Sequence, residues 1–141
     1  MKIRGERLQW GNPVDGYQYK IPASGDRPEG EAQLIYKRVS DTLPEVQSIL
    51  SNHGLQPDDK IAHLNEFYPN GRGRDEEVGE HMREGVGTAA LDFLIGQCIS
   101  QGAKAIYVFS VTSSMQSFLS KKEFETFGPN NCHHVKILKA S

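Results

Sequence analysis

Cysteine and long apolar runs are both scarce in this sequence. The 141 residues contain two cysteines, Cys98 and Cys132, so the sequence lacks the set of disulfide bonds that stabilises many small secreted domains. The apolar runs fall far short of the roughly 20 residues that cross a bilayer. The N-terminal stretch MKIRGERLQWG contains no apolar signal-peptide core. We therefore expect a cytoplasmic protein with no membrane partner.

An excess of charge of one sign is also missing. The chain has 16 Lys and Arg against 18 Asp and Glu, which gives a net charge of −2. Because nucleic-acid binders usually carry a basic excess, we expect no nucleic-acid partner. The length predicts a single domain over residues 1–141, with 37% hydrophobic residues to supply a core. A homodimer is left open.

Several signatures of nucleotide and metal sites are absent. The sequence has no G-x-x-x-x-G-K-[ST] P-loop and no complete G-x-G-x-x-G Rossmann fingerprint. Cys132, His133 and His134 are metal-ligand types, but neighbours on a strand point to opposite faces. No second cluster has zinc-like spacing, so we expect no metal.

The order of predicted elements favours a mixed α/β sheet. β-branched and aromatic residues predict strands over 2–10, 17–23, 32–40, 60–69, 103–111 and 133–140. Apolar periodicity predicts helices over 42–53, from residue 85 onward, and within 112–125. The first of these begins with a possible capping box, Thr42 and Glu45, and the last with another, Ser113 and Gln116. Cys98 falls in the apolar row of the middle helix, so we expect it to be buried and not paired with Cys132.

The stretch REGVGTAALDFL begins its helix with two glycines in three residues, which is a costly start. The first turn of a helix has free N–H groups, and the helix dipole favours an anion there. Gly85 and Gly87 would let a phosphate approach the backbone. Tight helix packing or a sharp turn would explain the same glycines.

Four stretches within residues 60–135 resemble the core of the GNAT superfamily, the acetyl-CoA-dependent N-acetyltransferases. EFYPN resembles the end of a family strand that finishes near V-x-P. MREGVGTAALDFL resembles the pyrophosphate loop and helix, QGAKAIYVFSV the next strand, and SFLSKKEFE the later helix. The resemblance implies a GNAT-like α/β fold, an α+β mixed sheet of the acyl-CoA N-acyltransferase type. Its N-terminal half would be reduced or rearranged, because hairpin-like strands here precede a single helix.

The resemblance also implies an activity, in which an acetyl group moves from acetyl-CoA to an amine of a small molecule or protein. Pantetheine would lie between two diverging strands, and the loop amides would hold the pyrophosphate. A non-catalytic acyl-CoA-binding or interaction module on the same scaffold is the alternative. The cofactor-binding residues implied are Phe67, Arg83, Glu84, Gly85, Val86, Gly87, Thr88, Ser114 and Lys121.

Catalytic candidates lie at the end of the strand over 60–69. Strict alternation would place Glu66 on one face with Ala62, Leu64 and Tyr68, and His63 on the other. We expect Glu66 to be the base, with His63 as second candidate; a solvent-exposed glutamate and a structural histidine are the alternatives.

Three residues depart from the family pattern. Met82 stands at the usual Gln or Arg, Leu119 at the usual tyrosine, and Glu123 at the usual glycine. Because leucine cannot donate a proton, the acid must come from elsewhere or be absent. The nearby substitutes in the sequence are Tyr68 and Tyr107, and we take Tyr68 as the catalytic candidate.

Overall fold

Seven strands and three α-helices make up the part of the chain that the computed structural model describes, residues 2–8, 15–25, 27–71 and 85–139. The strands are β1 (Arg4–Arg7), β2 (Gly16–Ile21), β3 (Gly30–Arg38), β4 (Lys60–Tyr68), β5 (Ala105–Phe109), β6 (Glu125–Phe127) and β7 (His133–Ile137). The α-helices are α1 (Pro44–Asn52), α3 (Val86–Ser100) and α4 (Ser113–Lys121), and the 3-10 turns are η1 (Val39–Asp41) and η3 (Pro129–Asn131). The predicted mixed α/β class is confirmed.

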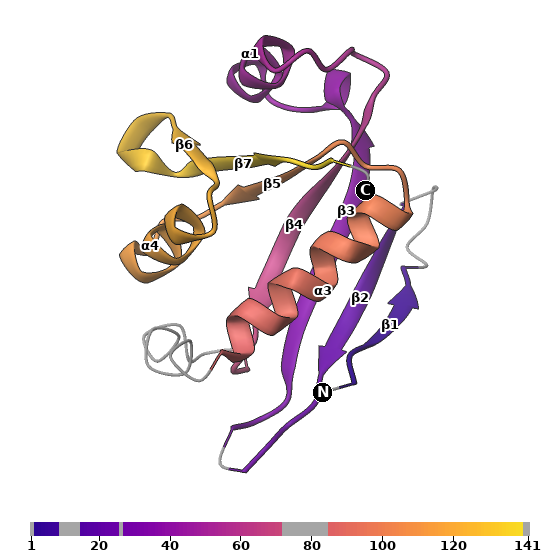
Figure 1. The fold of residues 1–141 in the computed structure, drawn as a ribbon, viewed down its shortest axis with the longest axis vertical. Coiled ribbons are helices and arrows are strands. Elements are labelled where there is room, and N and C mark those ends of the chain that lie inside the picture. The colour runs from indigo at the N-terminus through magenta and orange to yellow at the C-terminus, as the bar shows by residue number, and fades with distance from the viewer. Residues whose placement is uncertain (1, 9–14, 26, 72–84, 140–141) are drawn as a thin grey trace.

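The strands form one sheet in the order β1-β2-β3-β4-β5-β7-β6 (Figure 1). Strands β1 to β4 pair antiparallel in chain order, and we call them the N-terminal leaf. Strands β5, β7 and β6 also pair antiparallel, and we call them the C-terminal leaf. The leaves meet where β4 pairs parallel with β5, after the crossover through α3 that a parallel connection requires.

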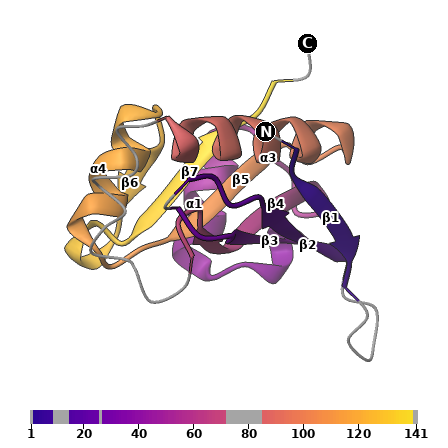
Figure 2. The ribbon, with the colours of Figure 1, turned by 90° about the horizontal axis from the view of Figure 1, so that it is seen from below.

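Helices cover both faces of the sheet, with α3 on one side and α1 on the other (Figure 2). The α3 side buries Ala90, Leu91, Leu94 and Cys98 of the helix, so the predicted burial of Cys98 is confirmed. On the α1 side, Val46 and Leu50 pack in a second cluster. Strand β5 contributes to both clusters, as expected for a strand covered on two sides.

Both predicted capping boxes are wrong, although the helices themselves are confirmed. Leu43 is the N-cap of α1, and the Thr42 hydroxyl instead donates to the Val39 carbonyl at 2.7 Å. At α4 the cap is Thr112, whose hydroxyl accepts from the Met115 N–H at 3.4 Å. The Gln116 amide donates to the Ser110 carbonyl at 3.0 Å. Serine and threonine are interchangeable as caps, so sequence spacing alone did not distinguish neighbours.

The end of α4 differs most from the prediction. The helix stops at Lys121, and Glu123 adopts a left-handed conformation with φ 67°. The Phe124 N–H then bonds the Leu119 carbonyl at 3.1 Å, as in the motif that usually places glycine at this position. Strand β6, which the sequence did not predict, follows at once.

In the described part of the chain, no helix combines the length and the apolar character that crossing a bilayer demands.

Candidate functional site

The two central strands separate after a short pairing. Strand β4 pairs with β5 only at Ala62 with Ile106 and at His63 with Tyr107. Beyond that point β4 follows β3, while β5 turns away with β7 (Figure 1). A cleft of about 190 Å³ opens between them, lined by Leu64–Tyr68, Val108–Thr112 and Met115. We call this cavity the cleft; it is where the GNAT resemblance expects the strands to diverge.

A β-bulge at Asn65 changes which side chains share a face. Gln33 pairs with Glu66, but the next residue of β3 pairs with Leu64, so Asn65 is the extra residue. After it, Phe67 joins the α3-side cluster that also contains Ala62 and Leu64. The predicted alternation is therefore wrong: Glu66 lies on the opposite face from Ala62 and Leu64, the face that also carries His63.

Amide side chains hold the carboxylate of Glu66. The Gln18 amide donates to Glu66 Oε1 at 3.3 Å and accepts from the Gln33 amide at 3.0 Å. The Asn65 side-chain amide donates to the side-chain oxygen Oε1 of Gln33 at 2.7 Å, so the bulge residue completes the chain of hydrogen bonds. Glu66 and Tyr68 both line the cleft, as does Phe67.

Gly85 begins α3 in a conformation that suits glycine. Its φ is 81°, and as a glycine it has no side chain with which to cap the helix. The first bond within the helix runs from the Ala89 N–H to the Gly85 carbonyl at 3.0 Å. The N–H groups of Val86, Gly87 and Thr88 precede that bond and have no partner within the helix. This turn has the arrangement that binds anions.

Arg27 is a residue of this region that the sequence analysis missed. It is 6% exposed, and its Nη1 donates to the Pro69 carbonyl at 3.3 Å. Across the described ranges, no carboxylate forms an ion pair with it. It lines a hollow of about 410 Å³ together with Gly85 and Val86. A buried cation without a matching anion is costly, so its position beside the α3 turn favours an anionic ligand.

The remaining predicted residues are dispersed. Ser114 and Lys121 stand near opposite ends of α4, and neither lines the cleft. Leu119 is fully buried in the α3-side core, which explains why no polar group occupies this position. Arg83 and Glu84 lie outside the described residues, as does Met82.

Tyr107, His63 and His133 lie on the α1 side. The Tyr107 hydroxyl is 2.7 Å from Nδ1 of His133, and the ring of His63 is 5.0 Å from that of Tyr107. His134 is buried elsewhere, with Nδ1 2.9 Å from the Thr126 hydroxyl. Within residues 2–8, 15–25, 27–71 and 85–139, no three His, Cys, Asp or Glu residues gather as metal ligands would.

Both cysteines are buried and free. Burial raises the pKa of the Cys98 thiol to about 12, so it stays protonated and unreactive at neutral pH. Neither thiol is placed to act in the cleft, because neither lines it.

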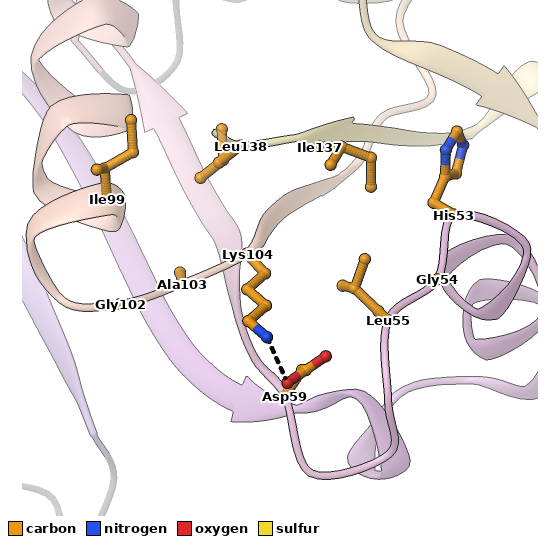
Figure 3. Close-up of a pocket in the computed structure, with 10 residues that line it drawn as sticks. All are labelled: His53, Gly54, Leu55, Asp59, Ile99, Gly102, Ala103, Lys104, Ile137 and Leu138. Atoms are coloured by element: carbon orange, nitrogen blue, oxygen red, sulfur yellow. Dashed lines mark hydrogen bonds and ion pairs between the residues drawn. The ribbon is translucent and has the colours of Figure 1, made fainter. Parts of the chain in front are cut away.

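A larger hollow of about 430 Å³ lies where β4 and β5 begin, at the end of the pair opposite the cleft (Figure 3). Its walls include Leu55, Ile99 and Leu138. Its two oppositely charged groups meet, since the Lys104 ammonium is 2.9 Å from Asp59 Oδ1. The Gln56 N–H and Lys104 hold the pKa of Asp59 below its usual value. No predicted site residue lines this hollow.

No family model matches the sequence, and no curated protein matches it. Among solved structures, the chain is similar to AtaT complexed with acetyl-methionyl-tRNAfMet, at 12% identity and a TM-score of 0.48, over 88% of this chain and 71% of that one. It is also similar to the KacTA–DNA complex, at 12% identity and a TM-score of 0.48, over 90% of this chain and 69% of that one. At this level the likeness assigns no activity to the chain.

Each of these two structures contains a nucleic acid. The prediction that nucleic acid is not a partner is contradicted by this finding and is not retained. Its weakness is physical: a net charge of −2 is a sum over the whole chain, and it does not describe how the 16 basic residues are distributed.

Proposed function

We propose that this chain is a GNAT-like N-acyltransferase that moves an acetyl group from acetyl-CoA to an amine of a small molecule or protein. One observation carries the proposal: β4 and β5 diverge into a cleft close to a glycine-started helix whose first N–H groups are uncapped. Such a site suits acyl-CoA, in which a slender pantetheine arm carries the acyl group at one end and phosphates at the other. A single domain over residues 1–141 and a cytoplasmic location stay predictions.

The first turn of α3 would hold the phosphates. The N–H groups of Val86, Gly87 and Thr88 would donate to the pyrophosphate, and Arg27 would supply the positive charge that Met82 does not. The pantetheine arm would lie in the cleft, against Phe67 of β4 and Met115 of α4. In this arrangement the acyl carbon would be close to Glu66 and Tyr68.

Direct acyl transfer needs positioning and proton transfer but no protein nucleophile. Glu66 would take a proton from the attacking amine, and Gln18 would orient its carboxylate. Tyr68 lines the same cleft and would protonate the departing thiolate. Tyr107 suits that role less well, because its hydroxyl is bonded to His133 on the α1 side.

The non-catalytic acyl-CoA-binding module remains the second candidate, and one observation favours it. Leu119 is fully buried among apolar side chains, so the position that usually carries the tyrosine acid is part of the core. The two candidates agree on CoA binding and differ on turnover.

Calorimetry with CoA and acetyl-CoA tests the proposal. Gly87→Glu adds bulk and negative charge at the turn, and we expect binding to be lost. Because Gly87 is buried, Thr88→Glu serves as a second variant: a glutamate in the first turn suits the helix but repels phosphate. Gly96→Glu, on the same helix with open space around it, is the matched control and should bind normally.

Equal CoA binding by folded wild type and Thr88→Glu would overturn the proposal. Acetyl-CoA binding without thiol release on a broad amine panel would favour the non-catalytic candidate instead.

A further inference from the structure

A further hollow lies on the α1 side of the sheet, and we call it the α1-side pocket. Its volume is about 460 Å³, and its lining residues are Lys37, Asp41, Thr42, Leu43, Pro44, His63, Asn65, Tyr107 and Phe109. Asn65 and Phe109 also line the cleft. The two hollows therefore adjoin at these two residues, close to where β4 and β5 separate.

The walls of this meeting point are unusually apolar for a surface. Within the described residues, the exposed large apolar side chains are Leu43 at 52%, Phe109 at 53% and Val111 at 74%. Leu43 and Phe109 line the α1-side pocket, and Val111 lines the cleft. Exposed apolar side chains gathered around one opening indicate a ligand with an apolar part.

The floor of the pocket offers hydrogen-bond acceptors. Burial, aided by the charge of Lys37, lowers the pKa of His63 to about 4, so its imidazole is neutral at neutral pH. A neutral imidazole keeps one nitrogen lone pair. No described residue forms a hydrogen bond with the His63 ring, and its neighbour across the strands is Tyr107.

Tyr107 has its own proton committed elsewhere. Burial raises the pKa of Tyr107 to about 12, so the hydroxyl keeps its proton. Nε2 of His133 is 3.6 Å from Glu45 Oε1, and this carboxylate favours a proton on Nε2. In that tautomer, Nδ1 of His133 accepts from the Tyr107 hydroxyl, which lies 2.7 Å away. With that proton used, the Tyr107 oxygen can only accept, so a ligand here must bring N–H donors.

The charges at the pocket favour a ligand with one amine rather than several. Lys37 and Asp41 both line it, but Asp41 is 3.5 Å from the Arg38 guanidinium. The carboxylate is thus already matched, and Lys37 would repel a polycation more strongly than it repels a single ammonium group.

We propose that the α1-side pocket binds the acceptor as a primary monoamine carried on a compact apolar group, with its nitrogen at His63 and Tyr107 and its apolar part against Leu43 and Phe109. This inference rests on the proposed function, because the amine would receive the acyl group held in the cleft. It goes further by naming the chemical class of the acceptor and the residues that select it.

The probe is 2-phenylethylamine, titrated into isotope-labelled protein and followed by NMR, with and without CoA. We expect saturable shifts at His63, Tyr107 and Phe109 in the millimolar range. His63→Leu should weaken binding roughly tenfold, the scale of one hydrogen bond. His53→Leu is the matched control, since His53 lies by the hollow of Figure 3 and pairs with Glu125. Spermidine, a polyamine, should not saturate the same signals.

Absence of saturable shifts at the pocket, equal affinity in folded His63→Leu, or tighter binding of spermidine would each overturn the inference. CoA binding, measured separately, should be the same in His63→Leu and wild type. If CoA binds and 2-phenylethylamine does not, the inference fails and the proposed function stands; if the amine binds and CoA does not, the proposed function fails.

Discussion

The two ends of the β4–β5 pair both carry hollows, but they differ in whether their polar groups have partners. At the closed end, where the strands begin, Lys104 meets Asp59 and the Lys60 ammonium donates to the Gln101 carbonyl at 3.2 Å. At the open end, the first turn of α3 has uncapped N–H groups and Arg27 has no ion pair among the described residues. The closed-end hollow, at about 430 Å³, is larger than the cleft at about 190 Å³ and slightly smaller than the α1-side pocket at about 460 Å³, so size does not separate the ends.

The difference shows where a ligand would be useful. Buried polar groups in folded proteins almost always find partners, so those without one identify positions that a ligand can satisfy. The closed end already satisfies its charges and has nothing to gain from an ion. The open end offers an anion the first N–H groups of α3 and the positive charge of Arg27, which is why we place the site there.

The largest expected effect breaks the chemistry at the open end. Glu66→Gln keeps the shape of the side chain and removes the base, so we expect turnover to fall roughly 10²-fold with acetyl-CoA affinity nearly unchanged. Thiol release on an amine panel measures it. Glu125→Gln, which changes a carboxylate bonded to His53, is the control and should retain full turnover. Near wild-type turnover in Glu66→Gln would remove Glu66 from the mechanism.

An intermediate effect concerns the buried arginine. Arg27→Gln should weaken CoA binding roughly tenfold, because a charge-assisted bond to phosphate is lost. Acetyl-pantetheine, which has no pyrophosphate, should bind both proteins equally. Arg4→Gln on the exposed strand β1 provides the comparison in calorimetry. An unchanged CoA affinity would mean that Arg27 has only a structural role, in which it bonds the Pro69 carbonyl from the connection between β2 and β3.

The smallest expected effect compares two helix ends. Gly102 follows α3 at the closed end with φ 82°, and Glu123 takes the matching position after α4 with φ 67°. Glu123→Gly should raise the free energy of unfolding by about 1 kcal/mol, since a left-handed conformation strains residues with a Cβ. Gly102→Glu should lower it by a similar amount, as space around Gly102 is open. Urea denaturation measures both changes, and a change of the same sign in the free energy of unfolding for the two variants would contradict this prediction.

The sequence predicted helices and strands well where a local residue pattern indicates them. Strand β4 was expected over 60–69 and spans Lys60–Tyr68, because Ile61, Phe67 and Tyr68 are types that favour strands. The bulge at Asn65 has no residue-type signature, so the face of Glu66 was assigned wrongly. Strand β6 was missed because it is three residues long and follows a glutamate where glycine would normally signal the turn.

The candidate site was predictable only in part, for the same reason. The cost of glycine at a helix start indicated Gly85 and Gly87 from local sequence alone. Arg27 reaches the turn only because Glu31 at the start of β3 pairs with Tyr68 at the end of β4. The α1-side pocket likewise joins residues from four separate segments, and no local pattern records such a meeting.

The divergence of β4 and β5 also creates two facing strand edges inside a sheet, which beyond the pairing of Ala62 and His63 join no other strand of the described residues. Edges of this kind usually lie at the rim of a sheet, where a foreign strand can add to them and begin aggregation. Here they face each other across a cleft of about 190 Å³ and spread apart from a pairing of only two residues on each strand. A β-strand cannot lie along both edges at once, because their spacing is not constant. The geometry thus protects the chain from strand addition while leaving backbone groups within reach of one slender molecule.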